Sequence, residues 1–281
     1  MISILFGLSA ALGWGAGDFT GGLASRKTGA YRAVLYSEIF GIVVLFFVIM
    51  FFGEPLPNAR VWIFAMLAGA LGTMGLILLY HAMTTGLMSI AAPVSALLAA
   101  VLPVLVGIFR EGLPKLTIFL GFCFALVAVW MISQGKGGIT DILSHLADLK
   151  LPLLAGIGFG SYFVLMHEAT NTGATIWPMI ISRTGGLILI IFYMFITRTS
   201  WKVEDPSAWP VIALNGILDV SGNAFFILAS QTGRLDVSAV LSSLFPGATV
   251  LLAWIFLKER LSRNQWIGIF AALLAIVFLT L

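Results

Sequence analysis

Ten long apolar runs dominate this 281-residue sequence and leave only short polar breaks between them. A membrane-spanning helix needs about 20 mostly apolar residues, so runs of this length predict transmembrane helices rather than the core of a soluble domain. The predicted spans are residues 2–24, 32–52, 61–83, 88–109, 114–133, 151–168, 174–196, 208–231, 236–257 and 262–280. The sequence therefore predicts an all-α membrane protein of ten transmembrane helices, with no room for a separate soluble domain.

The composition excludes several other classes of protein. Apolar residues make up 60% of the chain and charged residues 10%, against roughly 45–50% and about 25% in soluble domains. The net charge of +3 is weak evidence for nucleic acid, because such charge usually sets the orientation of a membrane protein. A single cysteine, Cys123, excludes an intramolecular disulfide and leaves a zinc-type ligand set short of sulfur. We expect no cofactor, no metal and no nucleic-acid partner.

The basic residues are divided unequally between the two sides of the predicted bundle. The side of both termini carries Arg60, Arg110, Lys115 and Arg234, and the opposite side carries Arg26, Lys27, Arg32, Lys136, Lys150, Arg198, Lys202, Lys258, Arg260 and Arg263. Lysine and arginine accumulate in the cytoplasmic loops of membrane proteins. This distribution predicts a multi-pass protein of the inner (plasma) membrane with both termini outside the cytoplasm.

The two halves of the chain repeat each other at a nearly constant offset. Gly13-Trp14-Gly15 recurs as Gly158-Phe159-Gly160 at an offset of 145 residues, and Trp62 recurs as Trp209 at 147. Further along, Arg110-Glu111-Gly112-Leu113 corresponds to Lys258-Glu259-Arg260-Leu261. Two units of five spans follow, and an odd number of spans forces the second unit to enter the membrane upside down.

The repeat predicts the organisation of the chain. We expect a first five-helix repeat at 1–136, a linker at 137–150 and a second five-helix repeat at 151–281. Inverted repeats of this kind are the architecture that secondary transporters use for alternating access.

Four charged residues lie deep inside the predicted spans, away from the span ends, namely Asp18, Glu38, Arg183 and Asp219. Each costs about 2.5 to 3.5 kcal/mol at a helix centre, so each needs a partner or a function. Arg183 cannot lose its charge. One interpretation is a structural ion pair with Glu38, its repeat equivalent, or with Asp219; the other is a clamp for an anionic group of a substrate.

Two helices carry polar side chains on one face. Asn215, Asp219 and Asn223 follow one another at four-residue intervals and form a stripe, which either lines a cavity or bonds to neighbouring helices. On the first helix, Trp14 and Asp18 stand one turn apart, an arrangement suited to a cation or an ammonium group. Small residues predict close helix contacts, and we expect helices 1 and 6 to pack closely through Gly13, Gly17, Gly21, Gly156 and Gly160.

Other polar residues are secondary candidates for substrate binding, although each also has a packing interpretation. His81 could relay a proton, since its unperturbed pKa lies near neutrality. The set comprises Tyr80, His81, Ser95, Ser161, Tyr162 and Ser242. Glu168 lies near a loop, where we expect it to be solvated, and Glu111 and Glu259 are interpreted as interfacial anchors.

The chain resembles the EamA family of the drug/metabolite transporter superfamily over nearly its whole length. The resemblance is carried by the doubled five-helix unit, by the Trp14-Gly15 pair, and by the run from Pro246 through Lys258-Glu259-Arg260-Leu261 to Gly268. It implies a fold in which helices 1, 3, 4, 6, 8 and 9 surround a central cavity and helices 5 and 10 are peripheral.

The resemblance and the polar residues together predict a secondary transporter of a small organic metabolite, amino-acid-like or amphoteric or cationic, working by alternating access. Proton coupling, an uncoupled facilitator and a cationic-drug exporter remain open. An intramembrane enzyme would need a nucleophile–base pair or a metal cluster, and we identify no catalytic residue. An ATP-driven pump lacks its Gly-x-x-x-x-Gly-Lys-Ser/Thr loop. The expected partners are a small-molecule substrate and the lipid bilayer, with the protein a monomer or a weak homodimer.

Overall fold

The computed structural model describes residues 2–84, 88–133, 149–171, 173–258 and 260–281, and this part of the chain is helical throughout its regular elements. Ten helical segments within it are long and apolar enough to cross a membrane. The helices of the first half are α1 (Ile2–Thr28), α2 (Ala30–Phe52), α3 (Ala59–Thr84), α4 (Met88–Glu111) and α5 (Leu116–Ser133).

The second half repeats this series with one interruption. Its helices are α7 (Lys150–Thr170), α8 (Ile176–Ile196), the short η2 (Pro206–Ala208), α9 (Trp209–Thr232), α10 (Leu235–Ser242), α11 (Phe245–Leu257) and α12 (Arg263–Thr280). The predicted spans agree with these helices to within four residues at each end, and the all-α membrane fold is confirmed. The linker predicted at 137–150 lies almost entirely outside the described residues, so the domain boundaries stay a prediction.

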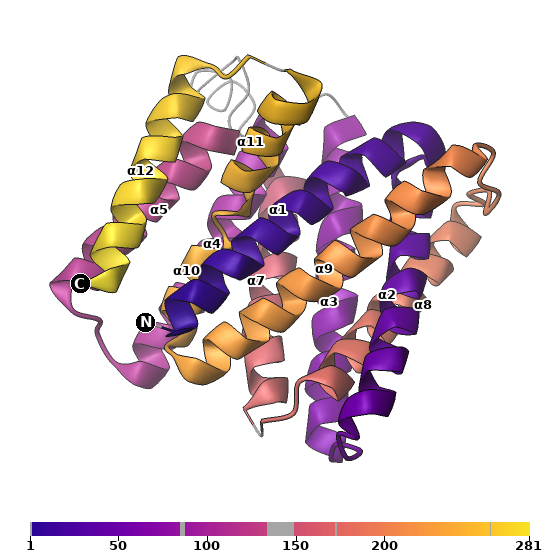
Figure 1. Ribbon diagram of the computed structural model, residues 1–281, viewed down its shortest axis with the longest axis horizontal. Helices are drawn as coiled ribbons and strands as arrows, with labels where there is room; N and C mark the ends of the chain where they lie inside the picture. The colour runs from indigo at the N-terminus through magenta and orange to yellow at the C-terminus, as the bar shows by residue number, and fades with distance from the viewer. Residues whose placement is uncertain (1, 85–87, 134–148, 172, 259) are drawn as a thin grey trace.

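Helices from the two halves pack against one another in matching pairs (Figure 1). The long α1 lies along α9, and its counterpart α7 lies along α3; α5 pairs with α12 at one end of the molecule, and α2 lies beside α8 at the other. Each pairing is reproduced when the two halves are exchanged. Two equivalent halves would give this pattern, and the inversion of the second half stays a prediction.

Both chain termini lie at the same end of the bundle (Figure 1). We call this end, which also carries the α2–α3, α4–α5, α7–α8 and α9–α10 connections, the terminal side. The α1–α2, α8–α9 and α11–α12 connections lie on the opposite side.

Glycines bring α1 against α9. A Cβ atom added to Gly13 would lie 2.9 Å from the Cα of Gly222, and one added to Gly17 would lie 3.7 Å from the backbone nitrogen of Asp219. The contact differs from the one expected from sequence, because α1 uses these glycines to meet α9 rather than the sixth helix. The sixth helix, α7, uses Gly156 instead to approach the Ser95 carbonyl of α4, at 2.7 Å from an added Cβ.

The ninth span consists of two separate helices. Pro246 stands in the first turn of α11, where it supplies no N–H donor, and residues 243–244 separate the two helices. All eight residues of α10 are buried, whereas no residue of α11 is. By contrast, α4 continues without a break through Pro93 and Pro103. Of these two proline-containing spans in the described part of the chain, only the ninth is therefore interrupted.

A carboxylate from another part of the chain caps α8. Glu54, in the connection after α2, accepts hydrogen bonds from the backbone N–H groups of Thr175 (3.1 Å), Ile176 (2.9 Å) and Trp177 (3.2 Å). The first N–H groups of a helix have no partner within it and carry the positive end of the helix dipole, so a carboxylate stabilises them. This contact fastens the α2–α3 connection to the second half on the terminal side.

The tight α1–α9 crossing makes a testable prediction. Gly13→Ala should lower the melting temperature of the purified protein in detergent, since the added methyl group meets the α9 backbone and overpacking of this kind costs about 1 to 3 kcal/mol. Gly22→Ala is the matched control, because a Cβ at Gly22 on the same helix meets nothing within 4 Å. Equal melting temperatures for the two variants would contradict this account of the crossing.

Candidate functional site

A buried arginine joins three helices in the interior of the bundle. The Arg183 side chain on α8 is 5% exposed and donates from Nη1 to the Glu38 carboxylate of α2 at 2.9 Å and from Nη2 to the Asp219 carboxylate of α9. Its Nε is buried and has no hydrogen-bond partner within the described part of the chain. Gly41 leaves room for the guanidinium, since an added Cβ there would lie 2.6 Å from Nη1.

The network continues from Asp219 to a fourth helix. Asn223 donates from Nδ2 to the Asp219 backbone carbonyl at 2.9 Å and to its carboxylate at 3.2 Å. The Tyr162 hydroxyl on α7 donates to the Asn223 amide oxygen. Four helices thus contribute to one hydrogen-bonded chain, which we call the central network: Glu38, Arg183, Asp219, Asn223 and Tyr162.

Asp18 lies beside this network but outside its hydrogen bonds. It is close enough to Asp219 for the two carboxylates to interact electrostatically, and no hydrogen bond or ion pair holds it among the described residues. Asp18 is exposed and the Asp219 side chain is 37% exposed, although both stand well inside membrane-spanning helices. Because lipid cannot solvate them, the two carboxylates need water or a polar ligand beside them.

Aromatic side chains form a layer next to the network. The Trp14 ring lies 5.4 Å from Phe163 of α7 and 5.7 Å from Phe226 of α9, and the two phenylalanine rings lie 4.9 Å apart. Phe226 is fully buried and Phe163 is 5% exposed. On α9, Phe226 follows Asp219 toward the terminal side by about 10 Å at 1.5 Å per residue. The layer therefore separates the carboxylates from the terminal side.

The remaining predicted residues fall into different environments. Asn215 on α9 packs its amide against Gly21 of α1, on the same face as Asp18. Ser242 is fully buried in α10 and donates to the Gly7 carbonyl at 3.5 Å, and Ser95 is 2% exposed. Ser161 is half-buried on α7, and His81 is exposed near the end of α3. The side chain of Tyr80 lies outside the described residues.

Two buried carboxylates on the terminal side were not recognised from the sequence. Glu168, which we expected to be solvated, is 6% exposed and pairs with Arg60 of α3 at 3.0 Å and with Arg110 of α4. Asp236 is fully buried and pairs with Arg234 at 2.7 Å. The arginines that pair with Glu168 lie on other helices, and Arg234 of the α9–α10 connection precedes Asp236. No local sequence pattern revealed these pairs. Glu259, interpreted together with Glu111 as an anchor, lies outside the described residues.

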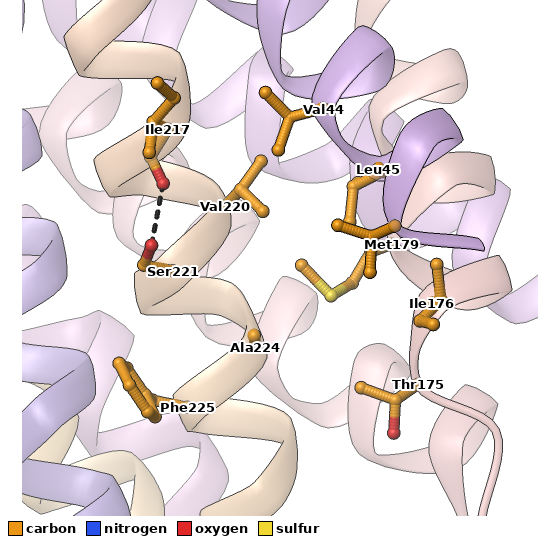
Figure 2. A pocket seen from close by; sticks show the side chains of 11 residues that line it. Val44, Leu45, Thr175, Ile176, Met179, Ile217, Val220, Ser221, Ala224 and Phe225 are labelled. Atoms are coloured by element: carbon orange, nitrogen blue, oxygen red, sulfur yellow. Dashed lines mark hydrogen bonds between the residues drawn. The ribbon is translucent and has the colours of Figure 1, made fainter. Parts of the chain in front are cut away.

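An apolar groove of about 300 Å³ lies between α2, α8 and α9, and none of its lining residues belongs to the central network (Figure 2). Thr175 and Ser221 are its only polar side chains, and the Ser221 hydroxyl donates to the Ile217 carbonyl of its own helix at 2.9 Å. Such a lining offers an organic solute no charge and almost no hydrogen bonds. The groove is therefore poorly suited to recognise a polar solute. No metal-binding group of three His, Cys, Asp or Glu residues occurs among the described residues.

Comparisons with known proteins agree with this arrangement. The sequence profile described as the EamA-like transporter family matches residues 1–134 and 148–281. "Putative ribose uptake protein RbsU" of Latilactobacillus sakei is 23% identical, covering 98% of this chain and 96% of that protein. An uncharacterized protein of Methanocaldococcus jannaschii is 26% identical, covering 44% of this chain but 88% of that protein. A crystal structure with 18% identity shares the fold with a TM-score of 0.80, over 99% of this chain and 98% of that one.

The fold and the polar network inside it, taken with these matches, define a multi-pass membrane transporter of a small solute. The chain belongs to the EamA-like transporter family, which is part of the drug/metabolite transporter superfamily.

The buried arginine makes a second prediction. Arg183→Gln should lower the free energy of unfolding by about 3 to 5 kcal/mol, because it leaves Glu38 and Asp219 without their shared counter-charge. Arg26→Gln, which removes an exposed arginine from the end of α1, is the control and should leave stability nearly unchanged. Thermal unfolding in one detergent measures both. A fully stable Arg183→Gln protein would show that the network does not hold α2, α8 and α9 together.

Proposed function

We propose that the protein is a secondary transporter that moves a small polar organic solute across the inner (plasma) membrane by alternating access. Its main substrate-binding residues are Asp18, Asp219 and Trp14. The observation that carries the proposal is the presence of two accessible carboxylates beside an aromatic ring in the middle of a membrane-spanning bundle. The doubled match to the family profile and the half-length relative support an ancestral duplication, and hence two inverted halves.

The charges of the site favour coupling to a proton or binding of a cation. Glu38 and Asp219 pair with Arg183, and Asp18 lies beside Asp219, so two negative charges are left over when all three carboxylates are ionised. Unbalanced charge in a membrane interior is costly, and a proton or a cationic group would remove part of that cost. Asp219 is already paired with Arg183, whereas Asp18 is not. Asp18 is therefore the first candidate for the exchangeable proton, with Asp219 as its partner.

Two classes of substrate are compatible with the site. A cationic or amphoteric solute such as an amino acid would place its ammonium group between Asp18 and Trp14. A neutral sugar would donate hydroxyl groups to the same carboxylates and to Asn215, and would enter together with a proton. The sugar is favoured by one specific observation, the ribose-uptake name of the relative that matches nearly the whole chain. The uncoupled facilitator and the cationic-drug exporter are the competing mechanisms.

The proposed site can be tested by transport. D-ribose, L-alanine and tetraphenylphosphonium are first screened by thermal shift, since a ligand at 100 times its Kd adds about 2.7 kcal/mol of stability. For the solute that binds, Asp18→Asn in proteoliposomes should abolish accumulation driven by a pH gradient while exchange of labelled for unlabelled solute continues. Asp219→Asn should reduce both activities, because it also disturbs Arg183.

Asp205→Asn serves as the control for these variants. Asp205 lies outside the membrane spans, where hydrogen bonds from Ser207 lower its pKa, and its carboxylate caps η2 rather than the transport site. It should leave uptake unchanged. Uptake by Asp18→Asn that still responds fully to the pH gradient would rule out Asp18 as the coupling residue.

We also propose that both termini lie outside the cytoplasm, as the distribution of lysine and arginine predicts. A reporter enzyme that is active only outside the cytoplasm should be active when fused after Leu281 and inactive when fused after Ser200, in the α8–α9 connection on the opposite side. The reverse result would show that the terminal side faces the cytoplasm.

A further inference from the structure

The C-terminal end of α4 lies directly on the beginning of α10. A Cβ added to Gly107 of α4 would lie 2.8 Å from the Cβ of Asp236 and 3.1 Å from its carboxyl carbon. Asp236 is fully buried beneath this glycine. At this point α4 of the first half and α10 of the second half are therefore in direct contact.

Arg234 fastens this contact. Its guanidinium donates to both Asp236 carboxylate oxygens, at 3.1 and 2.7 Å, and to the backbone carbonyls of Glu111 at 3.3 Å and Gly112 at 3.0 Å. The Glu111 carboxylate in turn accepts from the Leu235 N–H at 3.1 Å. We call Gly107, Glu111, Arg234 and Asp236 the latch. It ties the end of α4 to the α9–α10 connection, and Arg234 remains 27% exposed to the terminal side.

The latch closes the route that leads from the terminal side to the central network. From the network outward, the successive barriers are the aromatic layer of Trp14, Phe163 and Phe226, then the wholly buried α10, then the latch. Asp18 is nevertheless exposed, and the Asp219 side chain is 37% exposed. Access to them from the opposite side of the bundle would bypass these barriers.

The offset of 148 residues that pairs Arg110 with Lys258 pairs Glu111 of the latch with Glu259, Arg234 with Gly86, Asp236 with Met88 and Gly107 with Ile255. At the equivalent positions the sequence therefore keeps one of the four latch residues.

We infer that the latch is a gate on the terminal side, and that its rupture is the step that opens the central site to that side. The inference rests on the proposed alternating-access function. Opening separates α4 from α10, exposes the Asp236 carboxylate to water and releases Arg234 from the α4 carbonyls.

Cysteine labelling tests the gate without any solute. In a Cys123→Ala background, which removes the exposed native thiol, Ser238→Cys places a reporter on α10 where the native side chain is 1% exposed. The purified protein in detergent is treated with a polar maleimide, which reaches residue 238 only when the terminal side opens. Arg234→Gln should speed this labelling about tenfold or more, because loss of one member of a buried charge pair weakens the closed state strongly.

Two further variants keep the test decisive. Gly107→Ala changes no charge but inserts a methyl group against Asp236, and it should also accelerate labelling. If Arg234→Gln does not purify in folded form, the labelling rate of Gly107→Ala alone tests the gate. Lys115→Gln removes a positive charge from the α4–α5 connection on the same side and should label like the parent. The inference is overturned if folded Arg234→Gln and Gly107→Ala label no faster than Lys115→Gln.

Labelling and transport separate the two proposals. Fast labelling of the latch variants in a protein for which no solute is transported would support the gate and overturn the proposed function. Unchanged labelling in a protein that transports its solute would overturn only the gate.

Discussion

The rest of the structure depends on one buried guanidinium. Arg183 can be neither deprotonated nor solvated by lipid, so the fold must supply its counter-charges from within. It does so with Glu38 from the first half and Asp219 from the second, while Gly41 provides the space. Asp219 is thereby fixed in position, and through it Asn223 and Tyr162. The requirement to neutralise a single cation thus orders side chains from α2, α7, α8 and α9 around the interior of the bundle.

Much of this fold could be predicted from the sequence, because the bilayer imposes its thickness on every apolar run. The ten spans, the ionisable residues within them and the polar stripe on α9 all follow from local patterns. Contacts between residues that are distant in the sequence do not follow from such patterns. Glu54 caps α8, and Glu168 joins two arginines, only because the tertiary fold brings them there. Similarly, the glycines of α1 predicted a close contact but carried no information on which helix would fill it.

The sequence identified the residues of the candidate site more fully than it identified the contacts between them. The sequence indicated Asp18, Asp219 and Trp14 as separate candidates and left the partner of Arg183 open between Glu38 and Asp219. The structure gives Arg183 both carboxylates and leaves Asp18 beside them. Whether a carboxylate is paired or available depends on helix rotation and on spacing of a few ångströms, which side-chain periodicity does not resolve. The chemical distinction between a supporting acid and an exchangeable one therefore required coordinates.

The two helices of the divided ninth span lie in different surroundings. The α10 half is enclosed by protein on all sides, whereas α11 carries Trp254, Ile255 and Phe256 on an exposed surface that meets lipid. Bilayer thickness and lateral tension act on apolar surface that touches acyl chains, so they reach α11 and bypass α10. The bilayer therefore contacts only the half of this crossing that lies away from the termini, and the half on the terminal side is shielded from it by protein.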